Sequence, residues 1–410
     1  MTYLSLTKSI KKIVAVLIFL IFIVSNVIAQ NSVKETGVRG VWVPAPSFTS
    51  VLHTYKNVVA FVKQLDKLNL NSIYLVSYAV SKTVFPSKVL TEYSTYESPN
   101  DGYFLAPYIN AYNVPLKSPT GDPVRDLIDE AHKRNIKVFF WFEYGFMGDV
   151  APIPASNPLL ARNPHWLGLG NDNLPSSYNK HDYYFNAYHP DVQEYLIKLI
   201  EESLTLYPDL DGIQGDDRMP AMPRNSGYDD YTVSIYQKEH NGAKPPFDFN
   251  EPLWIRWRLN KLNDFGKNLY ARVKAKNNNA MVSFAPNPYP WSMDNLMQEW
   301  PQWSKDGICD LLAVQCYRYT AAAYEATVSD VLKFTRQSNP SQLIATGIIL
   351  MEGGSIKMTP KLLTEQVAIN RKLGINSEIY FYNEALKNKK IRKTLKALYP
   401  NKVQFPVVKH

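Results

Sequence analysis

The sequence predicts an α/β fold in which eight parallel strands close into a (β/α)8 TIM barrel with long loops on its C-terminal face. Eight short strand-like runs alternate with eight amphipathic helical segments after residue 37. Connections before strands are short, whereas three of the connections after strands are long. The alternative is an open, doubly wound sheet. It is disfavoured because Gly37–Gly40 lies before and inside the first strand, where a phosphate-binding glycine loop does not occur.

The strand-like runs are rich in β-branched and aromatic residues, as strands covered on both faces usually are. In chain order they are expected at Val38–Val43, Ser72–Ser77, Lys137–Phe142, Gly212–Gly215, Ala280–Ala285, Leu311–Gln315, Gln342–Leu350 and Glu378–Tyr382. The helical segments carry apolar residues three and four positions apart. They are expected at Lys56–Leu68, Pro123–Arg134, Val192–Leu206, Pro252–Lys276, Met293–Lys305, Ala322–Gln337, Pro360–Leu373 and Asn383–Leu398.

The first residues predict a secretory signal. Lys8, Lys11 and Lys12 precede the apolar run Ile13–Val24, and Val27–Ala29 offers a cleavage site. An uncleaved anchor is the alternative, but the apolar run is shorter than the roughly 20 residues that span a bilayer. We therefore expect a signal at 1–29 that is cleaved near Ala29, a barrel domain at 30–400 and a C-terminal tail at 401–410. The mature protein would then be secreted or periplasmic, without a stable membrane anchor.

The composition is that of a globular protein with a mild positive charge. The chain has 410 residues, of which 45% are hydrophobic and 20% charged. Without the three signal lysines, 45 basic residues become 42 against 37 acidic ones, and the net charge falls from +8 to +5. This balance suits adhesion to anionic envelope polymers but is too diffuse to predict nucleic-acid binding. The basic residues between Lys387 and Lys393 are expected on a solvated helix face.

The two cysteines do not predict a disulfide. Cys309 and Cys316 flank one predicted strand. Seven residues of strand span about 23 Å, whereas a disulfide needs Cα atoms within about 7 Å of each other. We expect two buried thiols. The sequence also lacks a zinc pattern and a phosphate-loop motif, so it predicts no metal and no cofactor.

Three long segments follow predicted strands: Ala79–Gly121, Tyr144–Pro190 and Met219–Glu251. Long ordered loops in compact domains are usually functional, and these three would share the C-terminal rim of the barrel. Asp211, in contrast, precedes its strand and is expected to be structural at the opposite end.

The strongest candidates for chemistry are carboxylates at the ends of predicted strands. Asp216 and Asp217 follow the fourth strand, Glu143 follows the third and Glu384 the eighth. Glycoside cleavage needs two such groups, one ionised and one protonated. Each acid also has a structural reading. The two aspartates can cap the next segment or pair with Arg218, Glu143 can bind a backbone amide, and Glu384 can favour the first turn of the last helix.

Polar and aromatic residues near the same strand ends are expected to bind the substrate. Trp42, Trp141 and Tyr382 would form walls that stack on sugar rings, although Trp42 and Trp141 are equally compatible with the core. His189 has a structural alternative at a helix start. The remaining candidates for contacts with sugar hydroxyls or charge are Tyr144, Asn186, Arg218, Asn287, Gln315, Tyr317 and Arg318.

Five ordered motifs carry a family resemblance. They are Arg39–Trp42, Trp141–Glu143, Asp211–Asp217, Ser283–Asn287 and Val314–Tyr317. The chain resembles the glycosyl hydrolase family 10-like proteins, a bacterial envelope and secreted group distinct from the family 10 xylanases. The similarity runs from about Val38 to Glu384.

The resemblance implies a (β/α)8 barrel that hydrolyses glycosidic bonds, and some relatives act on peptidoglycan glycan strands. It places the strand-four aspartate of the family on Asp216, whereas the next position varies and the position of Glu143 is an amide in other branches. This chain also has Asn186-Ala187-Tyr188-His189-Pro190 where relatives have Asn-Pro-x-His-Pro, a change expected to alter loop rigidity.

Together these observations predict a glycosidase that acts on a polysaccharide or glycan strand. Asp216 would be the nucleophile or charge stabiliser, and Glu143 or Asp217 the general acid, with Glu384 as a further candidate. The alternatives are a non-catalytic glycan-binding barrel and an envelope protein that docks a partner through an apolar rim. No nucleic-acid partner is expected, and the sequence makes no prediction of oligomeric state.

Overall fold

The computed structural model describes residues 35–106, 119–150 and 154–407. The predicted signal at 1–29 and its cleavage site near Ala29 lie outside these ranges. Contacts divide the chain after Thr36, and the fold concerns the unit from Gly37 onwards. Within the described ranges, no helix is long and apolar enough to cross a membrane.

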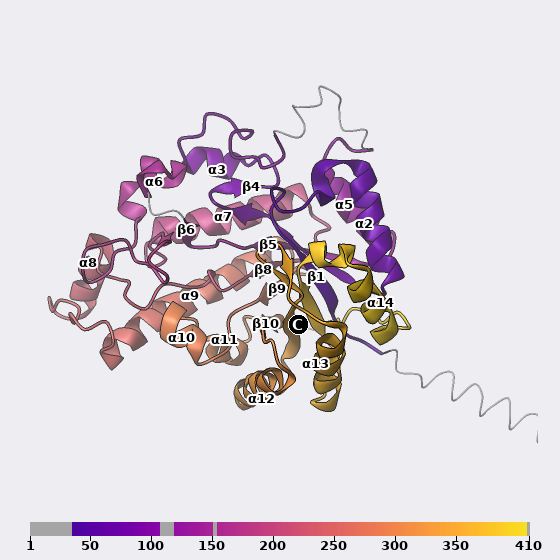
Figure 1. Cartoon of the computed structure of the whole chain (residues 1–410). Helices are drawn as coiled ribbons and strands as arrows, with labels where there is room; N and C mark the ends of the chain where they lie inside the picture. Colours follow the sequence, from indigo (N-terminus) through magenta and orange to yellow (C-terminus); the bar gives the residue numbers. More distant parts are fainter. Residues whose placement is uncertain (1–34, 107–118, 151–153, 408–410) are drawn as a thin grey trace, which may run out of the picture. The chain divides into compact units, whose positions relative to one another are not determined.

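Eight parallel strands form a closed barrel, which confirms the predicted fold class (Figure 1). The barrel closes because β1 pairs with β2 on one side and with β14, the last strand, on the other. In order around the barrel the strands are β1 (Arg39–Val43), β2 (Ser72–Val76), β5 (Lys137–Phe142), β8 (Gly212–Gly215), β9 (Met281–Phe284), β10 (Leu311–Val314), β11 (Leu343–Ile349) and β14 (Glu378–Phe381). Each predicted run contains its strand, with ends that differ by at most one residue.

Helices cover the outside of the barrel, each following a strand. Six of them agree with the predicted segments within two residues: α2 (Tyr55–Lys67), α5 (Pro123–His132), α7 (Pro190–Leu206), α9 (Pro252–Lys276), α12 (Ala321–Ser338) and α13 (Pro360–Lys372). Their buried faces are apolar, as in α2, where Val58, Val62 and Leu65 lie against the barrel.

The other two predicted helices are each broken in two. Met293–Lys305 is divided into α10 (Trp291–Leu296) and α11 (Trp300–Lys305), because Met297 adopts a left-handed conformation (φ 53°) that ends α10. Asn383–Leu398 is divided into the 3-10 turn η4 (Asn383–Lys387) and α14 (Lys389–Leu398), where Asn388 accepts hydrogen bonds from the first amides of α14 as its N-cap.

The long segments after the strands contain short elements of their own. Two-stranded pairs are formed by β3 (Tyr78–Ala79) with β4 (Lys82–Thr83), β6 (Met147–Asp149) with β7 (Tyr183–Tyr184), and β12 (Met351–Glu352) with β13 (Ser355–Ile356). The short helices are η1 (Val51–His53), α3 (Lys88–Tyr93), η2 (Pro154–Ser156), α6 (Pro158–Arg162), η3 (Pro164–Trp166) and α8 (Asp230–Glu239). All follow strand ends, so they build up the C-terminal rim as predicted.

Aromatic rings fill the barrel interior below this rim. Trp42 of β1 contacts Tyr74, Trp141 and Phe381, which come from three other strands, with ring centroids 6.1–6.3 Å apart. The Trp42 indole N–H donates to Gln214 Oε1 at 2.7 Å, and Gln214 donates to Ser283. These two hydrogen bonds connect buried polar side chains across β1, β8 and β9.

The opposite end of the barrel is closed by structural contacts. The Asp211 carboxylate accepts from Lys137 Nζ, contacts His132 Nε2 and accepts the backbone N–H of Val138, in agreement with its predicted structural role. The C-terminal segment is not a separate tail, because Arg39 donates to Asn401 O and Gly37 N–H donates to Gln404 O. Residues 401 and 404 thus contact the first strand and the residue before it, beyond the boundary that the sequence predicts at residue 400.

Both cysteines are free and buried, as predicted. Cys309 precedes β10 and Cys316 follows it, so the strand holds them apart.

Candidate active site

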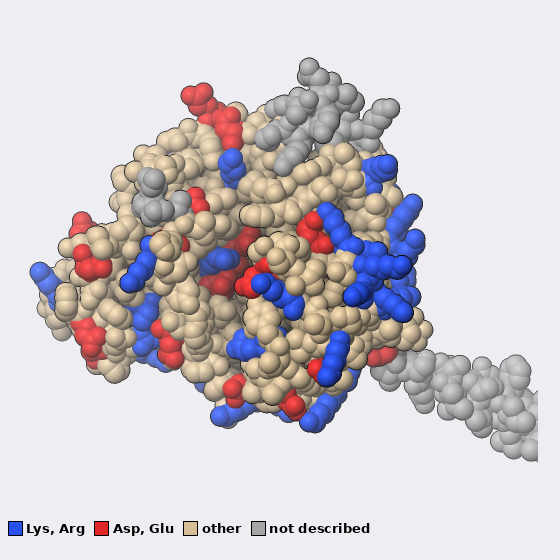
Figure 2. All heavy atoms as spheres, in the orientation of Figure 1, with Lys and Arg blue, Asp and Glu red and all other residues tan. Residues whose placement is uncertain are grey.

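Arg218 joins the loops that follow two neighbouring strands, β5 and β8. Its Nη1 lies 2.8 Å from Asp216 Oδ2 and 3.3 Å from Asp217 Oδ1, and it donates to the backbone oxygen of Glu143 at 3.1 Å. Figure 2 shows acidic and basic atoms in a hollow at the centre of the drawn face, over β5 and β8. Three of the four predicted catalytic acids, Glu143, Asp216 and Asp217, thus lie around Arg218. We call these four residues the Arg218 group.

Close backbone packing holds the two loops together. Gly145 has φ +47°, and a Cβ there would lie 2.5 Å from Arg218 O, so only glycine fits. The next residue, Phe146, donates its backbone N–H to the same oxygen at 3.0 Å. The Asp216 backbone oxygen accepts from Gln298 Nε2 at 2.9 Å, which fixes the start of the β8 loop.

Asp216 is the first acid to which the sequence points, but the structure places it below the surface. Only 1% of the residue is exposed. Its Oδ1 accepts the backbone N–H of Arg218 at 2.9 Å, and its Oδ2 accepts from Arg218 Nη1. Burial raises the pKa of Asp216 well above its ordinary value, against the opposing effect of Arg218. Direct attack on a sugar needs an accessible oxygen, so this position suits a residue that orients Arg218.

Asp217 and Glu143 are the more accessible acids of the group. The Asp217 side chain is 22% exposed, and its Oδ2 accepts from Asn287 Nδ2 at 3.0 Å. Glu143 is partly exposed. Burial raises its pKa to about 7; Arg218 opposes this shift and the negative charge of Asp217 adds to it. Glu143 is thus available to release a proton near neutral pH. The Asp217 carboxylate, in contrast, has two donors directed at it, from Asn287 and Arg218.

Further predicted residues surround this group. The Tyr144 ring centroid lies 5.4 Å from Arg218 Cζ. Burial raises the pKa of Tyr144 to about 12, with a smaller contribution from Glu143, so its hydroxyl stays protonated. The pKa of the Tyr317 hydroxyl is also raised, mainly by burial and then by the charges of Asp217 and Asp216. Asn287, Tyr144 and Tyr317 therefore belong to the site.

Other predicted residues follow strand ends and have partners of their own. Gln315 Nε2 donates to Ala285 O at 2.8 Å, and Arg318 Nη1 donates to Tyr317 O at 2.8 Å. Tyr382 is partly exposed and packs against Phe381 with ring centroids 5.1 Å apart. Trp42 and Trp141 are only 1% and 4% exposed, so in this structure they are core residues below the site and not accessible walls.

Glu384 does not join the Arg218 group. It lies in η4, before the last helix, where its Oε1 accepts from Thr49 Oγ1 at 2.9 Å. Its other oxygen pairs with Lys387. These contacts occupy both carboxylate oxygens and give Glu384 a structural role.

Asn186 was expected to contact sugar, but it is fully buried away from the Arg218 group. Its Nδ2 donates to Asp229 Oδ1 at 2.7 Å and to Thr232 Oγ1 at 3.0 Å, and its Oδ1 accepts the N–H of Tyr188. The contacts satisfy the amide between the segment that follows β5 and the one that follows β8, so no group remains for a sugar.

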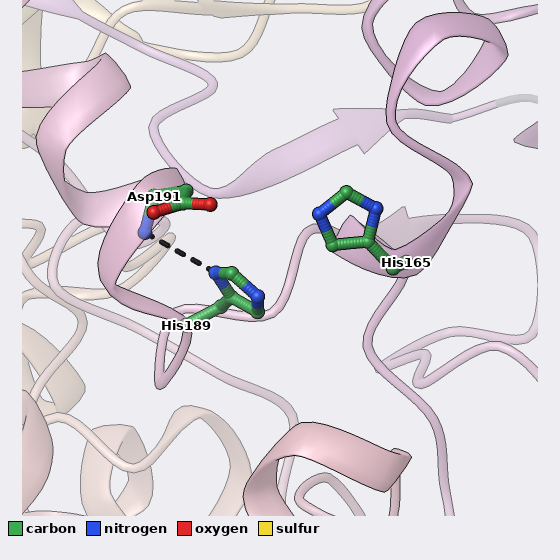
Figure 3. A group of neighbouring side chains, drawn as sticks. All are labelled: His165, His189 and Asp191. Atoms are coloured by element: carbon green, nitrogen blue, oxygen red, sulfur yellow. Dashed lines mark hydrogen bonds between the residues drawn. The ribbon is translucent and has the colours of Figure 1, made fainter.

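His189 is a helix cap and not a member of the site. It is 7% exposed, and its Nδ1 accepts the backbone N–H of Asp191 at the start of α7 (Figure 3). Burial lowers its pKa below the ordinary value. Its ring packs 4.3 Å from that of Tyr231. The structural alternative for His189 is therefore the one that its contacts support.

The same histidine lies in a group that has the residue types of a metal site. His165, His189 and Asp191 bring ligand atoms within 4.8 Å of one another (Figure 3). This set of residues fits a cation poorly. The Nδ1 of His189 accepts a backbone N–H, so the proton of the neutral ring is on Nε2 and neither nitrogen has a lone pair free for a cation. The positive end of the α7 dipole also disfavours a cation there. We therefore derive no metal chemistry from it.

Three residues of the site were missed by sequence reasoning. Gln298, in the turn between α10 and α11, donates to the backbone of Asp216. The charges of Arg218 and Asp217 act on the pKa of Tyr184 in β7. The Phe381 ring packs with its centroid 5.5 Å from that of Tyr317. Phe381 ends β14, next to the predicted residue Tyr382, and could have been found. Gln298 and Tyr184 lie outside the barrel strands, where no sequence pattern points to the site.

Comparison with known proteins identifies the family. Residues 37–367 match the model of the family described as glycosyl hydrolase-like 10. The chain belongs to the glycosyl hydrolase-like 10 family. This finding confirms the resemblance seen in the sequence.

Two curated bacterial relatives of the chain carry glycosyl hydrolase names. The chain is 22% identical over 360 residues to glycosyl hydrolase YngK of Bacillus subtilis, covering 78% of this chain and 62% of the relative. It is 23% identical over 309 residues to glycosyl hydrolase DigH of Escherichia coli K12, covering 66% and 61%. The chain thus spans about three fifths of the length of these curated relatives.

Solved structures with the same fold are glycoside hydrolases. The PgaB (BpsB) glycoside hydrolase domain from Bordetella bronchiseptica superposes with a TM-score of 0.63 at 14% identity, over 88% of this chain and 98% of that one. A GH42 β-galactosidase from G. stearothermophilus superposes with a TM-score of 0.58 at 10% identity, over 88% and 56%. At these identities the likeness establishes the fold alone.

Proposed function

We propose that this chain is a glycosidase that hydrolyses O-glycosidic bonds of an extracellular or envelope polysaccharide. The observation that carries the proposal is the pairing of Glu143, whose pKa is raised to about 7, with the accessible Asp217 beside Arg218. This pair provides a proton donor and a carboxylate within one site, as glycoside cleavage requires.

In the proposed reaction, Glu143 protonates the oxygen that leaves the anomeric carbon. Asp217 faces the positive charge that develops on the sugar ring, either by attacking the anomeric carbon or by activating water. Asn287 and Arg218 hold the Asp217 carboxylate in place. Asp216 acts through Arg218, because both of its oxygens are bound to that residue.

The proposed substrate is a polymer exposed outside the cytoplasm, with glycan strands of peptidoglycan among the first to test. Tyr144, Tyr317 and Tyr382 are partly exposed around the Arg218 group and suit sugar rings and hydroxyls. The proposed secreted or periplasmic location follows from the N-terminal sequence pattern alone.

The test is release of new reducing ends from peptidoglycan glycan strands and from a panel of neutral and amino-sugar polysaccharides. We expect Glu143→Gln and Asp217→Asn to lower the rate by about 10²-fold to 10⁴-fold. Asp216→Asn should lower it less, because it disturbs the position of Arg218 and leaves both proposed reacting carboxyl groups in place. Glu92→Gln, an exposed acid on α3, is the matched control and should leave the rate unchanged.

Two outcomes would contradict parts of this proposal. A larger loss in Asp216→Asn than in Asp217→Asn would return the central role to Asp216. Tight binding of a glycan by the wild type without new reducing ends would favour the alternative, a non-catalytic glycan-binding barrel.

A further inference from the structure

Helix α14 carries a concentration of positive charge that its own sequence does not balance. Five of its ten residues are basic and none is acidic, while Ile391 and Leu395 hold the opposite face in the core. Basic residues recur three and four positions apart on the solvent side, for example Lys389, Lys393 and Lys396. Like charges at these spacings destabilise a helix, so the pattern has an energetic cost that requires an explanation.

These charges line a groove between α14 and α2. The groove has a volume of about 1010 Å³ and is lined by Lys63 and Lys67 of α2 and by Lys389, Lys393 and Lys396 of α14. Figure 2 shows the corresponding gathering of basic side chains on the side of the molecule where α2 and α14 lie in Figure 1. Two helices thus direct amines toward one concave surface.

Acidic side chains do not neutralise the groove. Asp66 is the one carboxylate in its lining, and it pairs with Lys402. Glu384, in η4 before α14, is already paired with Lys387. Across the described ranges, the five lysines of the groove form no ion pair with the protein, so their charges are available to a partner.

We propose that the groove between α2 and α14 binds a linear anionic polysaccharide, through carboxylate or phosphate groups spaced along its chain. Charge complementarity supports this occupant. The floor, which includes Ala60 and Leu68 beside the aliphatic parts of the lysines, gives apolar contacts for the C–H faces of sugars.

Two other polyanions fit the groove less well. Its lining contains no aromatic residue on which single-stranded nucleic-acid bases could stack. It is concave and contains none of the exposed large apolar side chains of the described surface, which a membrane-binding face would insert into lipid.

The groove is also well placed for a polymer-binding role. Because α14 follows the carboxyl end of β14, its first residue, Lys389, lies toward the rim that carries the Arg218 group, and Lys396 lies further down the barrel wall. A bound polyanion would therefore keep the protein on an anionic matrix beside the site without entering it.

The test measures binding of fluorescently labelled polygalacturonate to the full chain at low and at physiological salt. The wild type should bind it and should not bind the fully methyl-esterified polymer, which has the same backbone without charge. The triple variant Lys63→Gln/Lys393→Gln/Lys396→Gln should bind about tenfold or more weakly, with a weaker dependence on salt. The matched control is Lys88→Gln/Lys276→Gln/Lys305→Gln, which removes three exposed lysines elsewhere and should bind as the wild type does.

The outcomes separate the proposal from its alternatives. Equal affinity of the groove variant and the wild type, or an equal loss in both triple variants, would overturn it. Tighter binding of a single-stranded oligonucleotide or of anionic phospholipid vesicles at the same lysines would overturn the choice of a glycan. Binding is read without turnover, so it also stands or falls separately from the proposed hydrolysis. The groove variant should unfold at the same or a slightly higher temperature, because it relieves like-charge repulsion.

Discussion

Three carboxyl groups, those of Glu143, Asp216 and Asp217, lie around the single guanidinium of Arg218. One positive charge therefore interacts with all three of them. Close carboxylates cannot all ionise at low cost, and burial adds to the penalty for those least exposed. The pKa of Glu143 is raised to about 7 and that of Asp216 is raised well above its ordinary value, although Arg218 opposes both shifts. Different protonation states within one site are what acid and base roles require.

The raised pKa of Glu143 predicts a measurable effect on stability. From the ordinary value of 4.5 to about 7, the folded state holds a proton that the unfolded chain releases. The free energy of unfolding therefore falls as the pH rises through this window and stays lower above it. Glu143→Gln removes this loss. The free energy of unfolding of the variant, minus that of the wild type, should therefore be about 1–2 kcal/mol larger at pH 8 than at pH 4.5.

Denaturant unfolding of both proteins from pH 4.5 to pH 8 measures this difference. The same substitution at the exposed Glu92 is the control and should keep the pH dependence of the wild type. A stability difference for Glu143→Gln that does not change with pH would mean that Glu143 titrates in the folded protein as it does in the unfolded chain.

At the residue scale, the sequence predicts which acids meet but not which of them is accessible. Asp216 and Asp217 are neighbours at one strand end, and their order along the chain does not show which side chain turns toward Arg218 and the core. That choice depends on the backbone of the loop, which Gly145 and Gln298 hold from other loops. Trp42 is a similar case, since its partner Gln214 is 172 positions away.

At the element scale, Asn186 shows how a loop polar residue can be structural. Its side chain connects the loop before α7 to the start of α8, because Asp229 is the N-cap of α8 and accepts from both Asn186 and Thr232. The network is buried, so each of its hydrogen bonds replaces contacts with water that were lost on folding.

Asn186→Ala should therefore lower stability and not glycan affinity. It removes three hydrogen bonds and leaves the buried Asp229 carboxylate with one donor fewer, for an expected loss of about 2–4 kcal/mol. Denaturant unfolding measures the loss, with the exposed Asn278→Ala as the control. Unchanged stability with weakened glycan binding would restore the predicted sugar contact.

Helices are predicted well where their apolar periodicity continues over the full length. They are predicted poorly where the backbone conformation of a single residue ends the helix early. The pattern of α9 continues over its full length, and the predicted and observed bounds agree. Met293–Lys305 has a similar apolar pattern, but Met297 turns into a left-handed conformation that methionine rarely adopts. Pro301, in the first turn of α11, is the local signal that a new helix begins after this turn, and the expected continuous helix overlooks it.

At the scale of the whole molecule, alternation of strands and helices predicts the closed barrel because each parallel strand needs a covering helix. The pattern does not show how the ends of the barrel are sealed. Here the segment after α14 does so, since Tyr399 donates to Glu378 Oε2 and Asn71 binds the Val403 backbone oxygen at 3.4 Å. Polar, nonperiodic residues of this kind resemble a free tail in sequence, which is why the sequence predicts a boundary at residue 400.

Removing residues 401–410 tests this closure. The deletion loses the hydrogen bonds of the Asn401, Val403 and Gln404 oxygens and the packing of Phe405 against Phe139, whose rings lie 5.7 Å apart. At about 1 kcal/mol for each hydrogen bond, with a further contribution from the ring, we expect a loss of about 3–4 kcal/mol and a lower Tm.

The rate per folded molecule should stay at the wild-type level, because these contacts lie at the end of the barrel opposite Arg218. Calorimetry alongside the reducing-end assay measures both quantities. An intact Tm would show that the segment does not stabilise the barrel, and a lost rate in fully folded protein would show that its contacts extend to the site.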